Sequence, residues 1–314
     1  MSTYRNGGLF VLLSILWGGL FVAIRAGLEY FPPVLYAAIR YDIAALFVFG
    51  YAVYATDYWW PRTRADWLAV ALDGVLVIGA YNAFLFLGER TVTSAVAAIL
   101  IAVNPILATV IARAVLPDER LTRVGAAGLL FGFLGVALVA RPNPAALLAS
   151  DSVAQLLVLA AAASVALGSV LVQRVDDGIA AEGTTAWACL IGAASLHVTS
   201  LGLPNESLVG VQWTIDAVLA VGYLGVFASA LGYFIYFGLL EKLGPIEINL
   251  ISYATTVPAG VLGWVLLGET IDIPTAIGFG VIFGGFALLK RDALRAEVES
   301  ARRSDSNASR REQQ

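Results

Sequence analysis

Two charged residues, Arg40 and Asp42, stand inside an otherwise apolar run of membrane length, residues 33–55. An arginine at membrane depth costs about 2.5–3.5 kcal/mol on insertion scales, so Arg40 should face a partner or a watery cavity. Its guanidinium group matches a carboxylate in shape, which makes Arg40 a candidate contact for an anionic or carboxylate-bearing solute. The alternative is a structural role, in which Arg40 reaches towards the interface or bonds to the carbonyls of neighbouring helices.

Asp42 is two positions further along and therefore lies on a different face of a helix from Arg40. A direct pair between the two side chains is not expected. Asp42 is a candidate carboxylate for proton coupling, or else a partner for another helix.

Polar and aromatic side chains deep inside other apolar runs are further candidates for solute binding. An aromatic-lined cavity would suit amino acids, aromatic metabolites or cationic drugs, although aromatic residues near a span end are also ordinary interface anchors. The candidates are Tyr81, Asn82, Asn104, Tyr233, Tyr236 and Tyr253.

Two prolines, Pro105 and Pro258, lie inside apolar runs. Each proline removes one helical hydrogen bond and frees the carbonyl group four positions earlier, which bends the helix and exposes polar backbone. These positions are predicted to be hinges beside a binding site, with simple packing kinks as the alternative.

The composition points to a membrane protein. Hydrophobic residues make up 59% and charged residues 13% of the 314 residues, and the mean hydropathy is +0.82, whereas a soluble domain carries about 25% charged residues. The single cysteine, Cys189, and the single histidine, His197, predict neither a disulfide nor a metal site. No Walker A or other nucleotide-binding motif occurs, so we expect no cofactor and no nucleic-acid partner.

Ten apolar runs are long enough to cross the roughly 30 Å of bilayer hydrocarbon as helices. They lie near residues 7–25, 33–55, 67–88, 92–113, 123–140, 153–173, 183–203, 215–239, 246–267 and 273–289. With the N-terminus inside, fifteen of the 19 basic residues fall on the cytoplasmic side and only Arg25, Arg90 and Arg141 on the outer side. This bias predicts that both termini are cytoplasmic.

The chain repeats itself at an offset of 150 positions. Glu119, Gly128, Gly135 and Arg141 recur as Glu269, Gly278, Gly285 and Arg291. Because each copy has an odd number of spans, the second copy is inverted relative to the first, as in many secondary transporters. The predicted fold is an all-α integral membrane protein of ten transmembrane helices in two inverted five-helix repeats. The repeats are predicted at 1–141 and 152–291, with a linker at 142–151 and a polar cytoplasmic tail at 292–314.

The chain resembles the EamA family of the drug/metabolite transporter superfamily over nearly its whole length. The resemblance is carried by WGGLFVAIR at 17–25, PPVLYAAIRY at 32–41, the duplicated proline–glutamate–glycine blocks, and SALGYFIYFGLLEKLGPIEINLISYATTVPAG at 229–260. It implies a transporter whose spans five and ten stand outside the transport core and serve packing or dimerisation. Gly128-x3-Gly132 and Gly280-x3-Gly284 on these spans would allow close helix contact, so a homodimer through them is a candidate partner.

These features favour a secondary transporter in the plasma membrane that moves a small organic metabolite, such as an amino acid or drug-like compound, by alternating access. Export is the favoured direction, and proton coupling is one option. A nucleotide-sugar or sugar-phosphate exchanger is the alternative, but it would need several basic residues around the cavity, and only Arg40 is clearly inside a span. An integral membrane enzyme acting on a lipid-linked substrate is a remote alternative because no clustered acidic, histidine or metal motif occurs, and the short loops argue against a receptor or scaffold.

Overall fold

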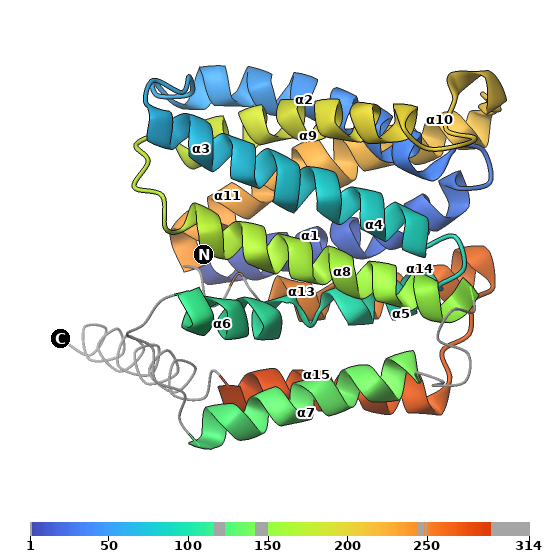
Figure 1. Ribbon diagram of the computed structural model, residues 1–314. Coiled ribbons are helices and arrows are strands. Elements are labelled where there is room, and N and C mark those ends of the chain that lie inside the picture. The colour runs from blue at the N-terminus through green and yellow to red at the C-terminus, as the bar shows by residue number, and fades with distance from the viewer. Residues whose placement is uncertain (1, 116–122, 142–149, 244–247, 249, 290–314) are drawn as a thin grey trace.

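A computed structural model describes residues 2–115, 123–141, 150–243, 248 and 250–289, and all regular structure in these ranges is helical. Figure 1 shows the helices running between two ends of one bundle. The elements of the first half are α1 (Ser2–Gly27), α2 (Pro33–Ala55), α3 (Arg64–Leu72), η1 (Asp73–Ala80), α4 (Tyr81–Gly88), α5 (Ser94–Ile101), α6 (Asn104–Val115) and α7 (Arg123–Ala140). Those of the second half are α8 (Ser150–Val172), α9 (Ala181–Leu201), η3 (Leu208–Gly210), α10 (Ile215–Gly222), η4 (Tyr223–Leu231), α11 (Gly232–Leu243), α13 (Ile251–Ala254), α14 (Thr256–Leu267) and α15 (Ile273–Leu289).

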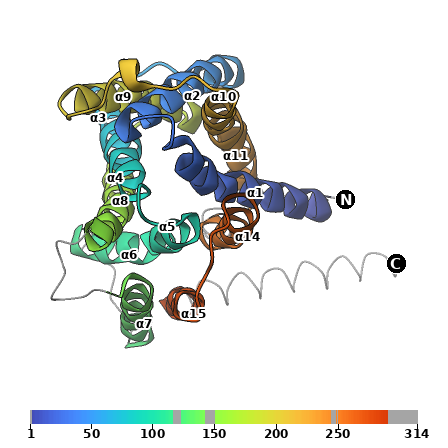
Figure 2. The same ribbon diagram turned by 90° about the vertical axis from the view of Figure 1, so that its right-hand side faces the viewer.

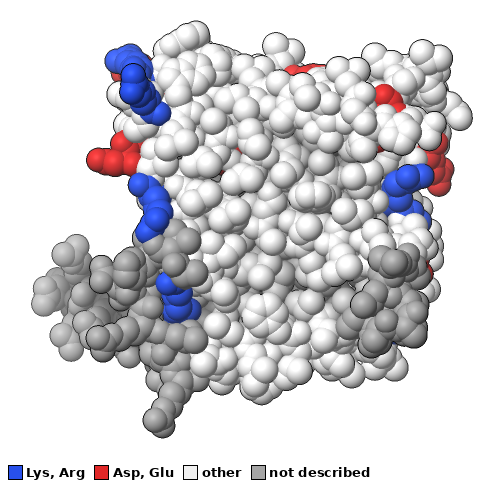
Figure 3. All heavy atoms as spheres, in the orientation of Figure 1, with Lys and Arg blue, Asp and Glu red and all other residues white. Residues whose placement is uncertain are grey.

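Seven helices in the described ranges are long and apolar enough to cross a membrane, and three shorter apolar helices accompany them at Val124–Ala140, Ile251–Leu267 and Ile273–Leu288. On the face shown in Figure 3, most charged side chains gather at the two ends of the bundle and leave a broad band with little charge between them. The protein is therefore a multi-pass membrane protein. The count of ten spans and the cytoplasmic position of both termini stay predictions.

The third and eighth predicted spans share an unusual feature. Each contains a π-helical segment, η1 from Asp73 to Ala80 and η4 from Tyr223 to Leu231, between two α-helical pieces. The two segments begin 150 positions apart, the same offset that relates the repeated residues in the sequence. Because π-helical segments are rare and concentrate at functional sites, their equivalent placement in the two repeats makes the region around them a candidate functional site.

The helices that carry the two prolines are interrupted close to them. α5 ends at Ile101 and α6 begins at Asn104, one residue before Pro105. In the second repeat α13 ends at Ala254 and α14 begins at Thr256, two residues before Pro258. Both breaks fall in the middle of a predicted span, where a missing backbone donor interrupts the ladder of helical bonds.

Helices α7 and α15 pack against each other along one edge of the bundle (Figures 1 and 2). A Cβ atom on Gly135 would lie 2.7 Å from the carbonyl oxygen of Gly278, and one on Gly285 would lie 2.7 Å from that of Gly128. The two backbones therefore approach more closely than any larger residue allows. By contrast, Gly280 and Gly284 have open space beside them.

Carboxylates close the ends of several helices. Glu269 accepts bonds of 3.1 and 3.0 Å from the backbone N–H of Ser94 and one of 3.2 Å from its hydroxyl, so a residue of the second repeat caps α5 of the first. Gly268, with φ of 68°, ends α14 in the left-handed conformation and turns the chain back towards this contact. Glu206 accepts in the same way from the N–H groups of Val34 and Leu35 at the start of α2. These bonds satisfy donors that lipid could not.

Several predicted features lie wholly or partly outside the described residues. Glu119 and the tail 292–314 are outside them, and so is the linker 142–151 except for its last two residues. Those two residues, Ser150 and Asp151, begin α8.

Replacing Glu269 by alanine should lower stability, because three bonds to a charged acceptor are lost and the N–H of Ser94, at the start of α5, is left without its acceptor. At about 1–3 kcal/mol for the lost bonds, we expect the Tm of the detergent-solubilised protein to fall by about 2–5 °C. The matched control is Glu29→Ala, since Glu29 is an exposed glutamate near the same end of the bundle. Equal melting curves for the two variants would contradict the capping role.

Replacing Gly135 by valine should separate α7 from α15, because the added side chain meets the backbone of α15. Overpacking of this kind costs about 1–3 kcal/mol, to be measured as a loss of Tm in detergent. Gly280→Val adds the same atoms to the other member of the helix pair, where space is open, and should leave Tm within about 2 °C of wild type. An equal loss of Tm in the Gly280 and Gly135 variants would contradict this packing.

Candidate functional site

The buried side chain of Arg40, on α2, is bonded to both halves of the protein. Its Nε donates to the hydroxyl of Ser229, in η4, at 3.0 Å, and its Nη1 donates to the Oδ1 atom of Asn82, in α4, also at 3.0 Å. Only 3% of Arg40 is exposed. Hydrogen bonds rather than a counter-ion stabilise the charge of Arg40, since the ion pairs found among the described residues do not include this residue.

Asn82 is held in turn by its neighbours. Its Nδ2 donates to the carbonyl of Ile78 at 2.7 Å and to the hydroxyl of Tyr41 at 3.2 Å. The guanidinium carbon of Arg40 also lies 4.8 Å from the centre of the Tyr41 ring, a cation–π contact. The arginine is therefore fixed on two sides before any solute binds.

A central cavity of about 200 Å³ lies beside this network. It is lined from both repeats by Trp17, Leu20, Phe21, Arg40, Tyr41, Val77, Tyr81, Ile101, Asn104, Val165, Ala228, Tyr233, Ser252 and Thr255. Asn104 and Thr255 stand at the two proline-associated helix breaks, so interrupted helices supply polar groups to the cavity. At roughly 30 Å³ per water molecule, this volume suits a solute about as large as an amino acid.

Two polar groups of the cavity lining are left without partners among the described residues. The Nη2 donors of Arg40 have no protein acceptor, because only Nε and Nη1 are bonded. The Oδ1 atom of Asn104 is buried and likewise has no donor. Buried polar groups are normally paired, so a free donor and a free acceptor facing one cavity mark a place for a polar ligand.

The structure brings together most of the residues predicted to bind solute. Arg40, Tyr81, Asn104 and Tyr233 line the cavity, and Asn82 stands behind Arg40 as its hydrogen-bond partner. 

The two remaining tyrosines do not line the cavity. Tyr236 stacks on the cavity residue Trp17 with ring centres 5.5 Å apart. Tyr253 is only 3% exposed and packs its ring against Phe283 and Phe286 of α15.

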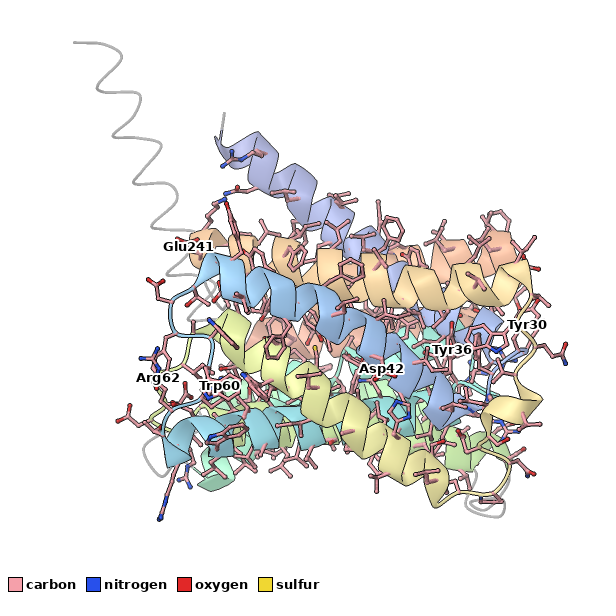
Figure 4. The ribbon with its side chains drawn as sticks, turned by 90° about the horizontal axis from the view of Figure 1, so that it is seen from above. Tyr30, Tyr36, Asp42, Trp60, Arg62 and Glu241 are labelled. Carbon is pink, nitrogen blue, oxygen red and sulfur yellow. The ribbon has the colours of Figure 1, made fainter. Side chains whose placement is uncertain are left out.

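Asp42 faces away from the cavity. It lies in the middle part of α2, between the bundle end that carries Tyr30 and Tyr36 and the end that carries Trp60 and Arg62 (Figure 4). Its Oδ2 atom is 2.8 Å from Nε2 of His197 on α9, and both side chains are about half exposed, at 50% and 42%. The pair ties α2 to α9 on the outside of the bundle.

A larger hollow of about 530 Å³ lies between α14 and α15. Its walls include Val257, Val261 and Trp264, which are 61%, 52% and 64% exposed. Its one charged lining residue, Glu269, is already bonded to Ser94. Exposed apolar walls of this kind are typical of a crevice that faces lipid, so the smaller central cavity is the better candidate site.

Packed aromatic side chains close the end of the bundle beyond the cavity. Phe31, Tyr36, Phe86 and Trp213 form this cluster, named here the outer plug after the orientation predicted from the basic residues. Tyr36 stacks on Phe31 at 4.7 Å and meets Phe86 edge-on at 5.3 Å, and Trp213 meets Phe31 edge-on at 5.3 Å. The Tyr36 hydroxyl donates to the carbonyl of Ala23 at 3.0 Å, which ties α2 to α1.

Sequence reasoning did not identify the residues that hold the site together across the repeats. Ser229 and Trp17 look like an ordinary small residue and an ordinary aromatic residue in apolar runs. Their roles depend on η4, because Ser229 accepts from Arg40, and Trp17 Nε1 donates to the carbonyl of Ala228 at 3.0 Å. The signal available was the repeat itself, since the region between two inverted copies is where a transporter site is expected.

The profile of the EamA-like transporter family matches the chain twice, over residues 6–141 and 152–291. Among curated proteins, an uncharacterised transporter of Archaeoglobus fulgidus is 25% identical over 275 residues, which cover 88% of this chain and 95% of that one. The uncharacterised inner membrane transporter YedA of Escherichia coli strain K12 is 29% identical over 279 residues, which cover 88% of this chain and 87% of that one. A WAT1-related chloroplastic protein of Arabidopsis thaliana is 27% identical over an alignment that covers 86% of this chain and 66% of that protein.

A solved crystal structure shares the fold, with a TM-score of 0.63 and 22% identity over 94% of this chain and 99% of that chain. The duplicated profile match covers most of the sequence, and the Archaeoglobus fulgidus and Escherichia coli relatives, both named as uncharacterised transporters, match over most of their length. This protein therefore belongs to the EamA-like transporter family and carries two copies of its repeat.

Proposed function

We propose that this transporter carries a small carboxylate-bearing organic solute, of amino-acid size, across the plasma membrane by alternating access. The observation that carries the proposal is the central cavity with Arg40 fixed on two sides and its Nη2 donors free. A guanidinium group held in this way offers its remaining N–H groups to a carboxylate without losing much side-chain freedom. The unpaired Oδ1 of Asn104 is a suitable acceptor for an amino group of the same solute.

The walls of the cavity favour a solute with an apolar or aromatic part. Trp17, Phe21 and Tyr233 line it, and burial of an apolar side chain against them contributes roughly 25 cal/mol per Å². These walls favour an amino acid or drug-like compound over the rival class, nucleotide sugars or sugar phosphates. The rival class requires several positive charges, and Arg40 is the only basic side chain among the described residues that line the cavity.

Export coupled to proton entry, with both termini cytoplasmic, is the direction and orientation that we propose. The basic residues support the orientation through the positive-inside bias. Homodimerisation through α7 and α15 also stays a proposal. Gly128 and Gly135 are already used between these two helices, so a second copy would have to approach the face of α15 on which Gly280 and Gly284 leave space.

Replacing Arg40 by alanine or lysine should weaken solute binding strongly. A charged hydrogen bond contributes about 1.5–3 kcal/mol, so we expect at least a tenfold loss of affinity in counterflow assays with radiolabelled amino acids in proteoliposomes. Lysine should not restore solute binding, because one ammonium group cannot donate to Ser229, Asn82 and a carboxylate in the planar arrangement of a guanidinium.

Arg64→Ala is the matched control, since Arg64 is exposed at the start of α3. If the Arg40 variants do not fold, Asn104→Ala tests the cavity without disturbing the arginine. Wild-type counterflow in either the Asn104 variant or a folded Arg40 variant would contradict this site. Counterflow of sugar phosphates but not of amino acids would support the rival class.

Asp42→Asn tests the carboxylate that the sequence selects for proton coupling. Because Asp42 lies outside the cavity lining and is bonded to His197, we expect the variant to keep transport driven by a pH gradient within about twofold of wild type, with a modest loss of Tm. The measurement is solute uptake into proteoliposomes with an imposed gradient, beside counterflow without one. Loss of gradient-driven uptake with normal counterflow would instead establish Asp42 as the coupling residue.

A further inference from the structure

A second buried ionisable group lies near the cavity, at Glu89 in the connection between α4 and α5. Its exposed fraction is 0%, and neither carboxylate oxygen has a hydrogen-bond partner among the described residues. None of the ion pairs in the described part of the chain involves it. The predicted spans 67–88 and 92–113 leave Glu89 in the short connection between them, where a carboxyl group buried without a hydrogen-bond partner is unexpected.

The charged neighbours of Glu89 are occupied elsewhere. Arg25, on α1, donates through Nη1 to the backbone carbonyl of Glu89 at 2.7 Å and also to that of Arg90, so its guanidinium holds main chain rather than the carboxylate. Glu269 is bonded to Ser94.

The other elements around Glu89 offer it little charge. From α2, Arg40 and Tyr36 are within electrostatic range, and Tyr81 is within range on α4. On α8, Ala154 and Val158 pack against the neighbouring Gly88 and are apolar.

Glu89 is aligned with the solute cavity along α4. Tyr81 lines the cavity, and Leu85 and Glu89 follow at intervals of four positions, so the three side chains share one face of the helix. Eight positions correspond to roughly 12 Å. Leu85 is fully buried, as are Tyr36 and Phe86 of the outer plug. The carboxyl group is thus separated from the cavity by the same packed layer that closes the outer end.

A carboxylate in this position would be costly, because nothing replaces the water that it loses. Burial raises the pKa of Glu89 well above its usual range, and the nearby charge of Glu269 raises it further, while Arg25 and Arg40 act in the opposite direction. Burial without a partner therefore favours the neutral form of the group while the outer end is closed. Once that end opens, water reaches the carboxyl group and its pKa returns towards the ordinary value.

We propose that Glu89 is a proton-binding site that links closure of the outer end to the uptake of one proton. In the outer-open state the carboxylate takes a proton from external water, and the neutral acid is then buried as α1, α2 and α4 pack together. The inference rests on the proposed alternating-access function and names a residue that binds a proton when the outer end closes and releases it to the same side when that end reopens.

The sign of the pH dependence follows from linkage. The closed state binds one proton more than the open state at any pH between the two pKa values of the carboxyl group. Closure is therefore favoured at low pH and weakens by up to tenfold per pH unit as pH rises through that interval. Below the pKa of the open state both states are protonated, and the dependence on pH disappears.

The test measures opening of the outer end directly. A cysteine replaces Val92, which is 6% exposed and close to Glu89, in a Cys189→Ala background. Its modification by a membrane-impermeant thiol reagent is followed in sealed cells between about pH 5.5 and pH 8.5. Rates are divided by those of Ser207→Cys, an exposed position in the same background, which removes the intrinsic pH dependence of the thiol reaction. We expect the normalised rate to rise with pH, by up to tenfold per unit.

Glu89→Gln is the critical variant, because a neutral amide of the same size cannot ionise. Its normalised rate should stay low at every pH, whereas Asp42→Asn should respond as wild type does. A rate independent of pH in the parent, or the same pH response in Glu89→Gln, would overturn the proposal. So would a response that follows sodium rather than protons when choline replaces Na⁺. If Glu89→Gln does not reach the membrane, Glu89→Asp serves instead. A shift in the midpoint pH of its normalised modification rate would support the proposal, and an unchanged midpoint pH would overturn it.

This assay needs no solute, so its result is independent of the proposed substrate. Absence of amino-acid counterflow together with a pH-dependent normalised rate would leave the proton site standing and remove the proposed substrate class. Amino-acid counterflow that depends on Arg40, together with a normalised modification rate that does not change with pH, would support the substrate class and remove the proton site.

Discussion

The site depends on one physical constraint, which is that the guanidinium of Arg40 keeps its charge inside the bundle. An arginine is not deprotonated in proteins, so a permanent charge at this depth must find hydrogen-bond acceptors. The acceptors come from opposite repeats, Asn82 from α4 and Ser229 from η4. The arginine consequently holds three elements together and fixes one wall of the cavity. Its structural and solute-binding roles, separate alternatives in the sequence, are compatible in this geometry because only two of its three nitrogen atoms are used.

The membrane explains why irregular backbone gathers around the cavity. In lipid every backbone polar group must be satisfied within the protein, so departures from the α-helix are tolerated where they face protein or a polar cavity. The π-helical segments η1 and η4 and the breaks beside Pro105 and Pro258 all lie in this region. The carbonyl of Ala228, in η4, bonds to the indole of Trp17. Interrupted helices thus supply both the polar groups and the close contacts of the site.

Much of this arrangement could be predicted from the sequence, because its signals are local or periodic. The duplicated blocks identify the family and its two repeats, and an arginine inside an apolar run signals a cavity on its own. The remainder depends on contacts between distant segments. Tyr233 and Tyr253 look alike in sequence, yet one lines the cavity and the other packs against α15. Helix face and depth in the final bundle decide such cases, and the nearly uniform apolarity of these spans gives little periodic signal for either.

Arg40 and Glu89 meet the cost of a buried charge in opposite ways. The arginine cannot lose its proton, so the protein surrounds it with acceptors and its charge is constant through any cycle. No donor among the described residues bonds to the carboxylate of Glu89, and burying that group costs least free energy when it is protonated. A constant charge is suited to holding an anionic solute, whereas a charge that changes with burial is suited to linking proton binding to movement. Because both lie on elements that meet at the outer plug, one opening motion would expose them in order, the carboxyl group first and the solute site behind it.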